Sequence, residues 1–216
     1  MPIDIDAAEE SIKQAKEKGE DRNFRESIDA IVNLRDIDVK DQQNRITTDV
    51  FLPKGTGKKS KVCVIGRGDL ALHAKEAGVD VLTQDDLNAL GKDRKKVKSL
   101  ASEYDYFLAQ VDMMPLVGRT LGSVLGPRGK MPKPVPPTAD LDEMLKSLSS
   151  TISIRTQRGQ PVVNSCIGTV DMDDRDLAVN LNAVVEAVER NLPRGRENIR
   201  SVVVKKSMGS PVEVTT

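Results

Sequence analysis

The spacing of apolar residues changes along the chain, and this change limits the folds that it can adopt. Over residues 28–34 and 46–52, side chains suited to a buried face recur at every second position, which predicts strands with one buried and one exposed face. Residues 62–65, Val-Cys-Val-Ile, are apolar without interruption, as is typical of a strand covered on both faces. Alternation returns near the C-terminus, over 199–206. The ends of the chain therefore follow one pattern and the middle follows another.

The middle of the chain has an order of elements that favours a parallel sheet. We expect strands at 62–65, 79–82 and 106–109, with helical sequence between them over about 70–77 and 84–101. Alternating strands and helices predict parallel strands with helices on the faces of the sheet. Nearer the N-terminus, we expect the strands over 28–34 and 46–52 to pair with each other in antiparallel fashion.

A helix and strands at each end, around a self-contained β/α block, predict that one domain is inserted into another. We assign residues 1–57 together with 155–216 to a split α+β domain with an antiparallel sheet. Residues 58–154 form the inserted α/β domain. The segment Pro53-Lys54-Gly55-Thr56-Gly57 predicts a hinge between the domains, because Pro and Gly interrupt both strands and helices.

Composition excludes several classes of protein. No apolar run approaches the roughly 18 residues that span a bilayer, and residues 1–21 are acidic, unlike a secretory signal. We therefore expect no membrane partner and a cytoplasmic location. Cys63 and Cys166 lie too far apart in sequence for a paired metal motif, and His73 is the single histidine. We expect no catalytic residue, no metal and no cofactor.

Charge is balanced over the whole chain but not within its segments. The sequence has 33 basic and 33 acidic residues, yet the net charge is −4 over residues 1–57, +3 over 58–154 and +1 over 155–216. Residues 113–139 contain no acid and four basic residues, which are Arg119, Arg128, Lys130 and Lys133. With three Phe, two Tyr and no Trp, the chain has few platforms for stacking single-stranded bases.

One turn fits the pattern of a dinucleotide-binding motif. Gly66, Gly68 and Ala71 match G-x-G-x-x-A between an expected strand and helix, and Asp85 and Asp86 follow about twenty residues later. A nucleotide-binding enzyme is therefore the alternative hypothesis. The simpler interpretation is a tight strand-to-helix turn, which Asp69 favours, because a carboxylate there would compete with a phosphate for the amides of the helix.

A second segment is rich in Gly, Pro and positive charge. Gly118, Gly122 and Gly126 recur every four residues, which predicts a smooth helix face that allows close backbone approach. The basic, Pro-rich residues that follow are not expected to form helix or sheet. They are either a solvated loop or a contact to RNA phosphates, and composition alone leaves both interpretations open.

The residues LGPRGKMPKP, 125–134, resemble the signature of the large-subunit ribosomal protein L-one family in its archaeal form. The resemblance extends over essentially the whole chain. It includes Arg22-Asn23-Phe24, Leu52-Pro53-Lys54-Gly55 with Gly57-Lys58, and Ser207-Met208-Gly209-Ser210-Pro211. It implies a split α+β domain with an inserted Rossmann-like domain that holds no nucleotide.

The resemblance also implies partners. Members of this family bind a folded region of large-subunit rRNA and form the mobile stalk beside the exit site for deacylated tRNA. Many of them repress translation of their own mRNA. We therefore expect large-subunit rRNA, exit-site tRNA and the protein's own mRNA as partners, a monomer when free of the ribosome, and no enzymatic activity.

By resemblance, the RNA contacts come from two parts of the split domain. They are Asn23, Phe24, Ser27, Asp29 and Asn33 from the first part, and Ser201, Ser207, Met208 and Gly209 from the second. Secondary basic contacts are expected from Arg22, Arg158, Arg128, Lys130 and Lys133. Small polar groups of this kind suit the shallow minor groove of A-form RNA and its 2′-hydroxyls, and they require few aromatic residues. Asn23 replaces a Lys that many relatives have, so one charge is missing from this set.

Overall fold

The computed structural model describes residues 4–18, 22–39, 41, 44–58, 60–91, 93–136, 141–157 and 159–214. The chain forms two compact units, Met1–Lys58 with Ser149–Thr216, and Lys59–Leu148. The first unit contains antiparallel sheets and the second contains a parallel sheet with helices. This confirms the predicted fold class, a split α+β part with an α/β part inserted into it.

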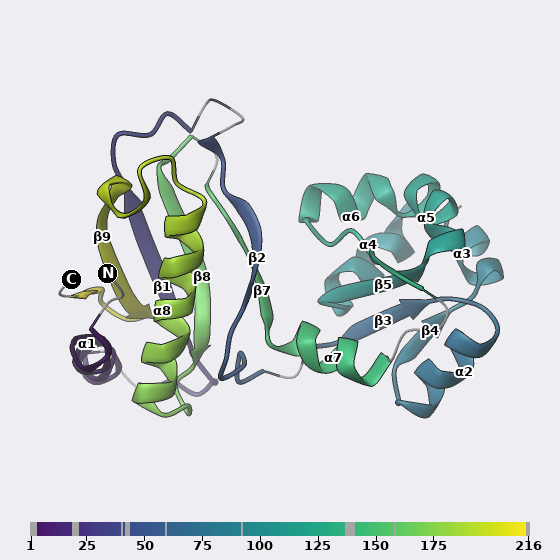
Figure 1. Ribbon diagram of the computed structural model, residues 1–216. Helices are drawn as coiled ribbons and strands as arrows, with labels where there is room; N and C mark the ends of the chain where they lie inside the picture. Colours follow the sequence, from purple (N-terminus) through teal and green to yellow (C-terminus); the bar gives the residue numbers. More distant parts are fainter. Residues whose placement is uncertain are drawn as a thin grey trace. The chain divides into compact units, whose positions relative to one another are not determined.

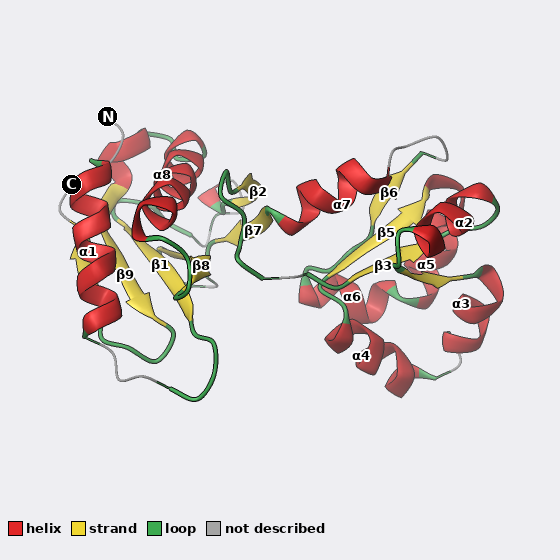
Figure 2. Cartoon of the chain, turned by 90° about the horizontal axis from the view of Figure 1, so that it is seen from below, coloured by secondary structure: helices red, strands yellow, loops and turns green. Residues whose placement is uncertain are grey.

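The first unit is built on a four-stranded antiparallel sheet with helices on one face (Figures 1 and 2). Its strand order is β10 (Val212–Val214), β9 (Ile199–Lys206), β1 (Ser27–Leu34) and β8 (Val162–Thr169). The helices α1 (Ile5–Glu17) and α8 (Asp174–Arg190) pack on each other and on this sheet. A two-stranded sheet pairs β2 (Thr47–Phe51) with β7 (Thr151–Arg155), and η3 (Gly195–Asn198) precedes β9.

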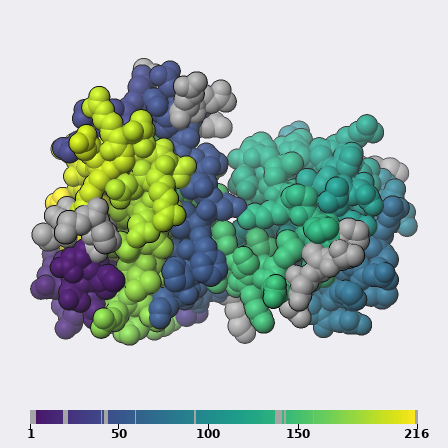
Figure 3. All heavy atoms as spheres, in the orientation of Figure 1, coloured from purple at the N-terminus to yellow at the C-terminus, as the bar shows by residue number. Residues whose placement is uncertain are grey.

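The core of the first unit follows from two periodicities in the sequence. Every second residue of β1 is buried, beginning with Ile28, so one face of that strand meets the helices. In α8, a stripe of apolar side chains from Leu177 to Val188 packs against the strands, and Asp173 caps the first turn. The opposite side of α8 forms part of the surface in Figure 3. No helix in the described part of the chain is long and apolar enough to cross a membrane.

The second unit has a parallel sheet of order β4-β3-β5-β6, with helices on both faces. Its strands are β3 (Val62–Ile65), β4 (Asp80–Leu82), β5 (Tyr106–Gln110) and β6 (Lys133–Val135). Its helices are α2 (Asp69–Glu76), α3 (Gln84–Leu90), α4 (Arg94–Glu103), η2 (Val111–Met113), α5 (Met114–Thr120), α6 (Gly122–Arg128) and α7 (Leu141–Ser149). Cys63 and Phe107 face α3 to α6, whereas Val64 and Leu108 face α2 and α7.

Three expectations from the sequence are wrong in detail. The strands β1 and β2 do not pair with each other, because β1 pairs with β8 and β9 while β2 pairs with β7. The helical sequence over 84–101 forms two helices, since Asp93 caps a new helix after α3 ends. The Pro-rich residues form strand β6, which tolerates Pro134 because it lies at the edge of the sheet.

The boundary between the units also differs from the sequence-based assignment. The sequence places residues 58–154 in the inserted domain, whereas residues 149–154 group with the first unit in the structure. The reason is that β7 pairs with β2 along its whole length. The segment 53–57, predicted to be a hinge, likewise lies within the first unit.

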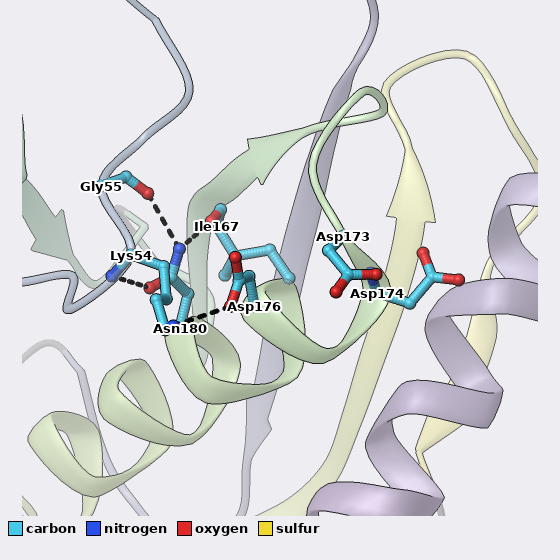
Figure 4. A network of polar contacts seen from close by, with 7 residues as sticks. All are labelled: Lys54, Gly55, Ile167, Asp173, Asp174, Asp176 and Asn180. Carbon is cyan, nitrogen blue, oxygen red and sulfur yellow. Dashed lines mark hydrogen bonds and ion pairs between the residues drawn. The ribbon is translucent and has the colours of Figure 1, made fainter.

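A buried amide holds that segment in place (Figure 4). Asn180 of α8 is fully buried; its Nδ2 donates to the carbonyl oxygens of Gly55 and Ile167, each at 2.9 Å. Its Oδ1 accepts from the backbone N–H of Lys54 at 3.1 Å. The Lys54 ammonium also lies 2.9 Å from a carboxylate oxygen of Asp176. A side chain bonded to three backbone groups makes this segment an ordered part of the first unit instead of a free hinge.

We predict that Asn180→Ala lowers the free energy of unfolding of the first unit by about 2–3 kcal/mol, because it leaves backbone groups unpaired in a buried place. Urea unfolding followed by circular dichroism measures this. Asn182→Ala, two residues along the same helix and only partly buried, should change stability by less than about 0.5 kcal/mol. Equal effects of the two substitutions would contradict the role given to Asn180.

Candidate nucleic-acid interface

The face of the four-stranded sheet that points away from α1 and α8 carries most of the predicted RNA contacts. We call it the open face. Register places Asp29 opposite Lys205 and Asn33 opposite Ser201, between the strands β1 and β9. On the other side of β1, Asp29 lies opposite Cys166 of β8. These residues are partly buried, whereas their neighbours along the strands belong to the core.

One end of the open face joins two predicted segments that are far apart in the chain. The backbone N–H of Ser207 donates to the carbonyl of Ser27 at 3.0 Å, and its hydroxyl lies 3.3 Å from a carboxylate oxygen of Asp29. The N–H of Met208 donates to the buried carboxylate of Glu26 at 3.4 Å. The structure therefore brings together the segments 22–29 and 207–209, which we call the joined segments.

The joined segments expose two large apolar side chains. Phe24 is 56% exposed and Met208 is 67% exposed, although apolar residues of this size are usually buried. Gly209 follows in a tight turn that its N–H closes on the carbonyl of Lys206 at 3.0 Å. A Cβ at Gly209 would lie 2.9 Å from Cβ of Lys206, so the turn requires glycine. The joined segments thus present two exposed apolar side chains, one of them next to a turn that only glycine fits.

The other end of the open face is a separate polar site. Asn33 Nδ2 donates to the Ser201 hydroxyl at 2.9 Å. Both residues line a hollow of about 480 Å³ that also includes Arg200 and Glu213. At about 3.3 Å per residue, Ser27 and Asn33 are roughly 20 Å apart along β1. The predicted contacts thus share one face but form two groups.

The expected RNA contacts did not include the cations of this face. Alternation in the sequence places Lys205 on the same face as Ser201 and Ser207, and the structure sets it opposite Asp29. Arg200 lies beside Ser201, and the Lys58 ammonium donates to the Ser27 hydroxyl. The positions of Arg200 and Lys58 depend on the folded path of the chain. Of the predicted cations near Asn23, Arg22 is exposed, and its neighbour Arg25 forms an ion pair with Asp171. Arg158 lies outside the described residues.

The signature cations of the second unit have structural partners. The Arg128 guanidinium donates to the Ser102 hydroxyl at 2.9 Å and to the carbonyl of Lys98 at 3.3 Å. The Lys130 ammonium donates to the carbonyl of Tyr104 at 2.7 Å, and to that of Ala101 at 3.2 Å. These carbonyls belong to the last turns of α4 and to its C-cap, where positive charge is stabilising. The segment is therefore ordered, and Lys133 lies within β6.

The G-x-G-x-x-A turn is used for packing. A Cβ at Gly66 would lie 2.8 Å from Cδ2 of Leu70. Glycine at this position therefore allows the first turn of α2 to pack close to the end of the strand. Asp69 lies in that first turn with its side chain exposed. Asp86 forms a capping box with Thr83, whose hydrogen bonds hold the pKa of the Asp86 carboxyl below its ordinary value. Nothing in this geometry favours a nucleotide.

Comparison with known proteins gives one consistent result. Residues 12–210 match the model of the Ribosomal protein L1p/L10e family. The chain is 50% identical over 206 residues to the large ribosomal subunit protein uL1 of Methanothermobacter thermautotrophicus, covering 95% of this chain and 97% of the relative. It is 48% identical to the uL1 protein of Methanobrevibacter smithii, with the same coverage, and 45% identical to that of Aeropyrum pernix, covering 95% and 94%.

The two cysteines should report on the two units. Burial raises the pKa of the Cys63 thiol to about 12, so its reactive thiolate is absent at neutral pH, whereas Cys166 lies partly exposed on the open face. We predict that iodoacetamide alkylates Cys166 in the native protein and reaches Cys63 only after unfolding. Peptide mass spectrometry measures both sites, with Cys166→Ser as the control. Rapid alkylation of Cys63 in the native protein would contradict its burial.

Proposed function

The chain belongs to the Ribosomal protein L1p/L10e family, and from this premise we propose that it is a component of the large ribosomal subunit that binds rRNA through the first unit. One observation carries the choice of surface. Two segments with residues expected to contact RNA, about 180 positions apart in sequence, meet in the joined segments, where Phe24 and Met208 stay exposed. Exposed apolar side chains rimmed by polar groups are typical of interaction surfaces.

The chemistry of the joined segments suits the backbone of a folded RNA. Hydroxyls of Ser27 and Ser207 can both donate and accept, and the Asp29 carboxylate can accept from a 2′-hydroxyl. Met208 has a flexible thioether that adapts to an irregular apolar surface, and Phe24 offers a ring face for a base or a ribose. The shape of the RNA and its sugar edges would then decide affinity more than bulk charge does.

We expect the electrostatic contribution to RNA affinity to be small and to come from a few cations on one face. Lys58, Lys205 and Arg200 lie on or beside the open face. Each phosphate that a cation neutralises lowers log K against log salt by about 0.7–0.9. Three such contacts give a slope of about two to three, which is shallow for a nucleic-acid-binding protein.

Family membership is the basis for the finer roles. We propose that the protein forms part of the mobile stalk, assists release of deacylated tRNA from the exit site, and represses translation of its own mRNA. It would act as a monomer away from the ribosome and work in the cytoplasm. The relatives are named as ribosomal proteins, so a non-enzymatic role is the stronger hypothesis; the exposed Asp69 and capped Asp86 weigh against the nucleotide-binding alternative.

We predict that Met208→Ala weakens binding to large-subunit rRNA by about 1–3 kcal/mol while leaving the salt slope nearly unchanged, because a neutral side chain is lost. Filter binding over a series of KCl concentrations measures both quantities. Met131→Ala removes another exposed methionine, in the second unit, and should change affinity less than twofold. If the two substitutions act equally, the joined segments are not the recognition surface.

Saturating rRNA should also slow alkylation of Cys166 on the open face.

The first unit should bind rRNA without the second. The Thr56 hydroxyl donates to the carbonyl of Ser149 at 3.2 Å, so the two connections to the second unit are adjacent and a short Gly-Ser linker can join Lys58, the last residue of this part of the first unit, to Ser149. We predict a folded module that binds rRNA within about tenfold of the full chain, or about 1.4 kcal/mol. Circular dichroism checks folding. A thousandfold loss in a folded module would move the principal contact to the second unit.

A further inference from the structure

The second unit contains a hollow that the proposed RNA surface does not use. Four helices pack together where α3 ends, α4 begins, and α5 passes into α6 (Figure 1). Between them lies a hollow of about 220 Å³ whose polar lining is Arg94, Arg119, Thr120 and Ser123, over an apolar base that includes Val97 and Val124. We call it the Arg94–Arg119 hollow.

Its two arginines have no carboxylate partner among the residues that the structure describes. Arg190 forms an ion pair with Glu186, and Arg128 donates to α4, so those two arginines have protein partners of a kind that Arg94 and Arg119 lack in the described part of the chain. The nearest acid in sequence, Asp93, accepts from the backbone N–H groups of residues 95 and 96 and caps α4. Two like charges held at one hollow favour an anion as the missing partner.

One hydroxyl of the lining can add a directed hydrogen bond to an anion. The Thr120 hydroxyl is not that one, because it already donates its proton to the carbonyl of Leu116 at 2.9 Å. Ser123 is exposed, so its hydroxyl can donate to a ligand. An arginine presents a planar fork of donors that matches two oxygens of a phosphate. The buried valines at the base exclude water from one side of such an anion, which strengthens these bonds.

The size of the hollow distinguishes between sources of phosphate. Pockets that enclose whole drug-sized ligands have volumes of roughly 300–1,000 Å³, and this hollow is smaller. It accommodates one phosphate group but leaves no room to enclose a base and a ribose. A phosphate that belongs to a polymer needs no such enclosure, since the rest of the chain runs over the surface.

We propose that the Arg94–Arg119 hollow binds a backbone phosphate of the large-subunit rRNA, as a second contact beside the one in the first unit. This inference rests on the proposed function, because it assumes that rRNA is the ligand of the protein. It gives the second unit a binding site that the signature residues Arg128 and Lys130 do not supply, since those two hold α4.

The test compares the full chain with the double variant Arg94→Gln/Arg119→Gln, using the complete large-subunit rRNA. The control, Lys61→Gln/Lys75→Gln, removes the same charge from exposed positions of the second unit outside the hollow. Loss of one phosphate contact should lower the salt slope by about 0.7–0.9 and weaken binding about fivefold at 0.15 M salt. The control should cause less than half of either change. Equal changes in both variants, or none in the first, would overturn the proposal.

Two further measurements separate the remaining explanations. Arg94→Lys/Arg119→Lys keeps both charges but loses the planar fork, so it should retain the slope and weaken binding roughly threefold. Hydroxyl-radical footprints should show one rRNA segment protected by the wild type and the control but not by the glutamine variant. Specific binding of inorganic pyrophosphate without any such footprint would overturn the assignment to RNA. Absence of rRNA binding by the wild type would remove the proposed function, and this inference with it.

Discussion

The pairing of β1 with β8 and β9 is the contact on which the first unit depends. Strand β1 belongs to the first 58 residues, and both of its partners follow the second unit in sequence. The pairing closes the core under α8, and it also sets the register that brings Asp29 beside Lys205. Because one shift of register would turn every side chain to the other face, core and candidate RNA surface are fixed by the same hydrogen bonds.

Asn180 extends that order to the place where the chain leaves the first unit. A fully buried amide is costly unless its partners are complete, and here it bonds the backbone of Lys54, Gly55 and Ile167. The Pro and Gly residues of segment 53–57 therefore set the direction in which the chain leaves the first unit. They do not make this segment a hinge by themselves. Motion of the stalk, as part of the proposed function, would have to come from residues beyond this anchored segment.

Local patterns in the sequence were sufficient for most of the strands, the fold class and the family, but not for the break between α3 and α4 or for strand β6. Alternation in β1 and the uninterrupted apolar run of β3 depend only on near neighbours, so both could be predicted. The partners of β1 and β2 depend on contacts across more than a hundred residues, which periodicity does not encode. For the same reason the roles of Lys58 and Arg200 and the Arg94–Arg119 hollow were missed, since each depends on elements that fold beside it. The hydrogen bonds of Lys130 to backbone carbonyls could not be predicted either, because the sequence shows a charged residue but not the groups that it contacts.

The split of the first unit has a consequence for synthesis of the protein. On a translating ribosome, residues 59–148 emerge as an uninterrupted segment. They can fold before β8 and β9, the strands that pair with β1, have been synthesised. The joined segments then form only when Ser207 reaches the carbonyl of Ser27, which is after the whole second unit has left the exit tunnel. A nascent or truncated chain that ends before β9 would therefore present a folded second unit without the candidate rRNA surface, and could not compete through that surface for the RNA.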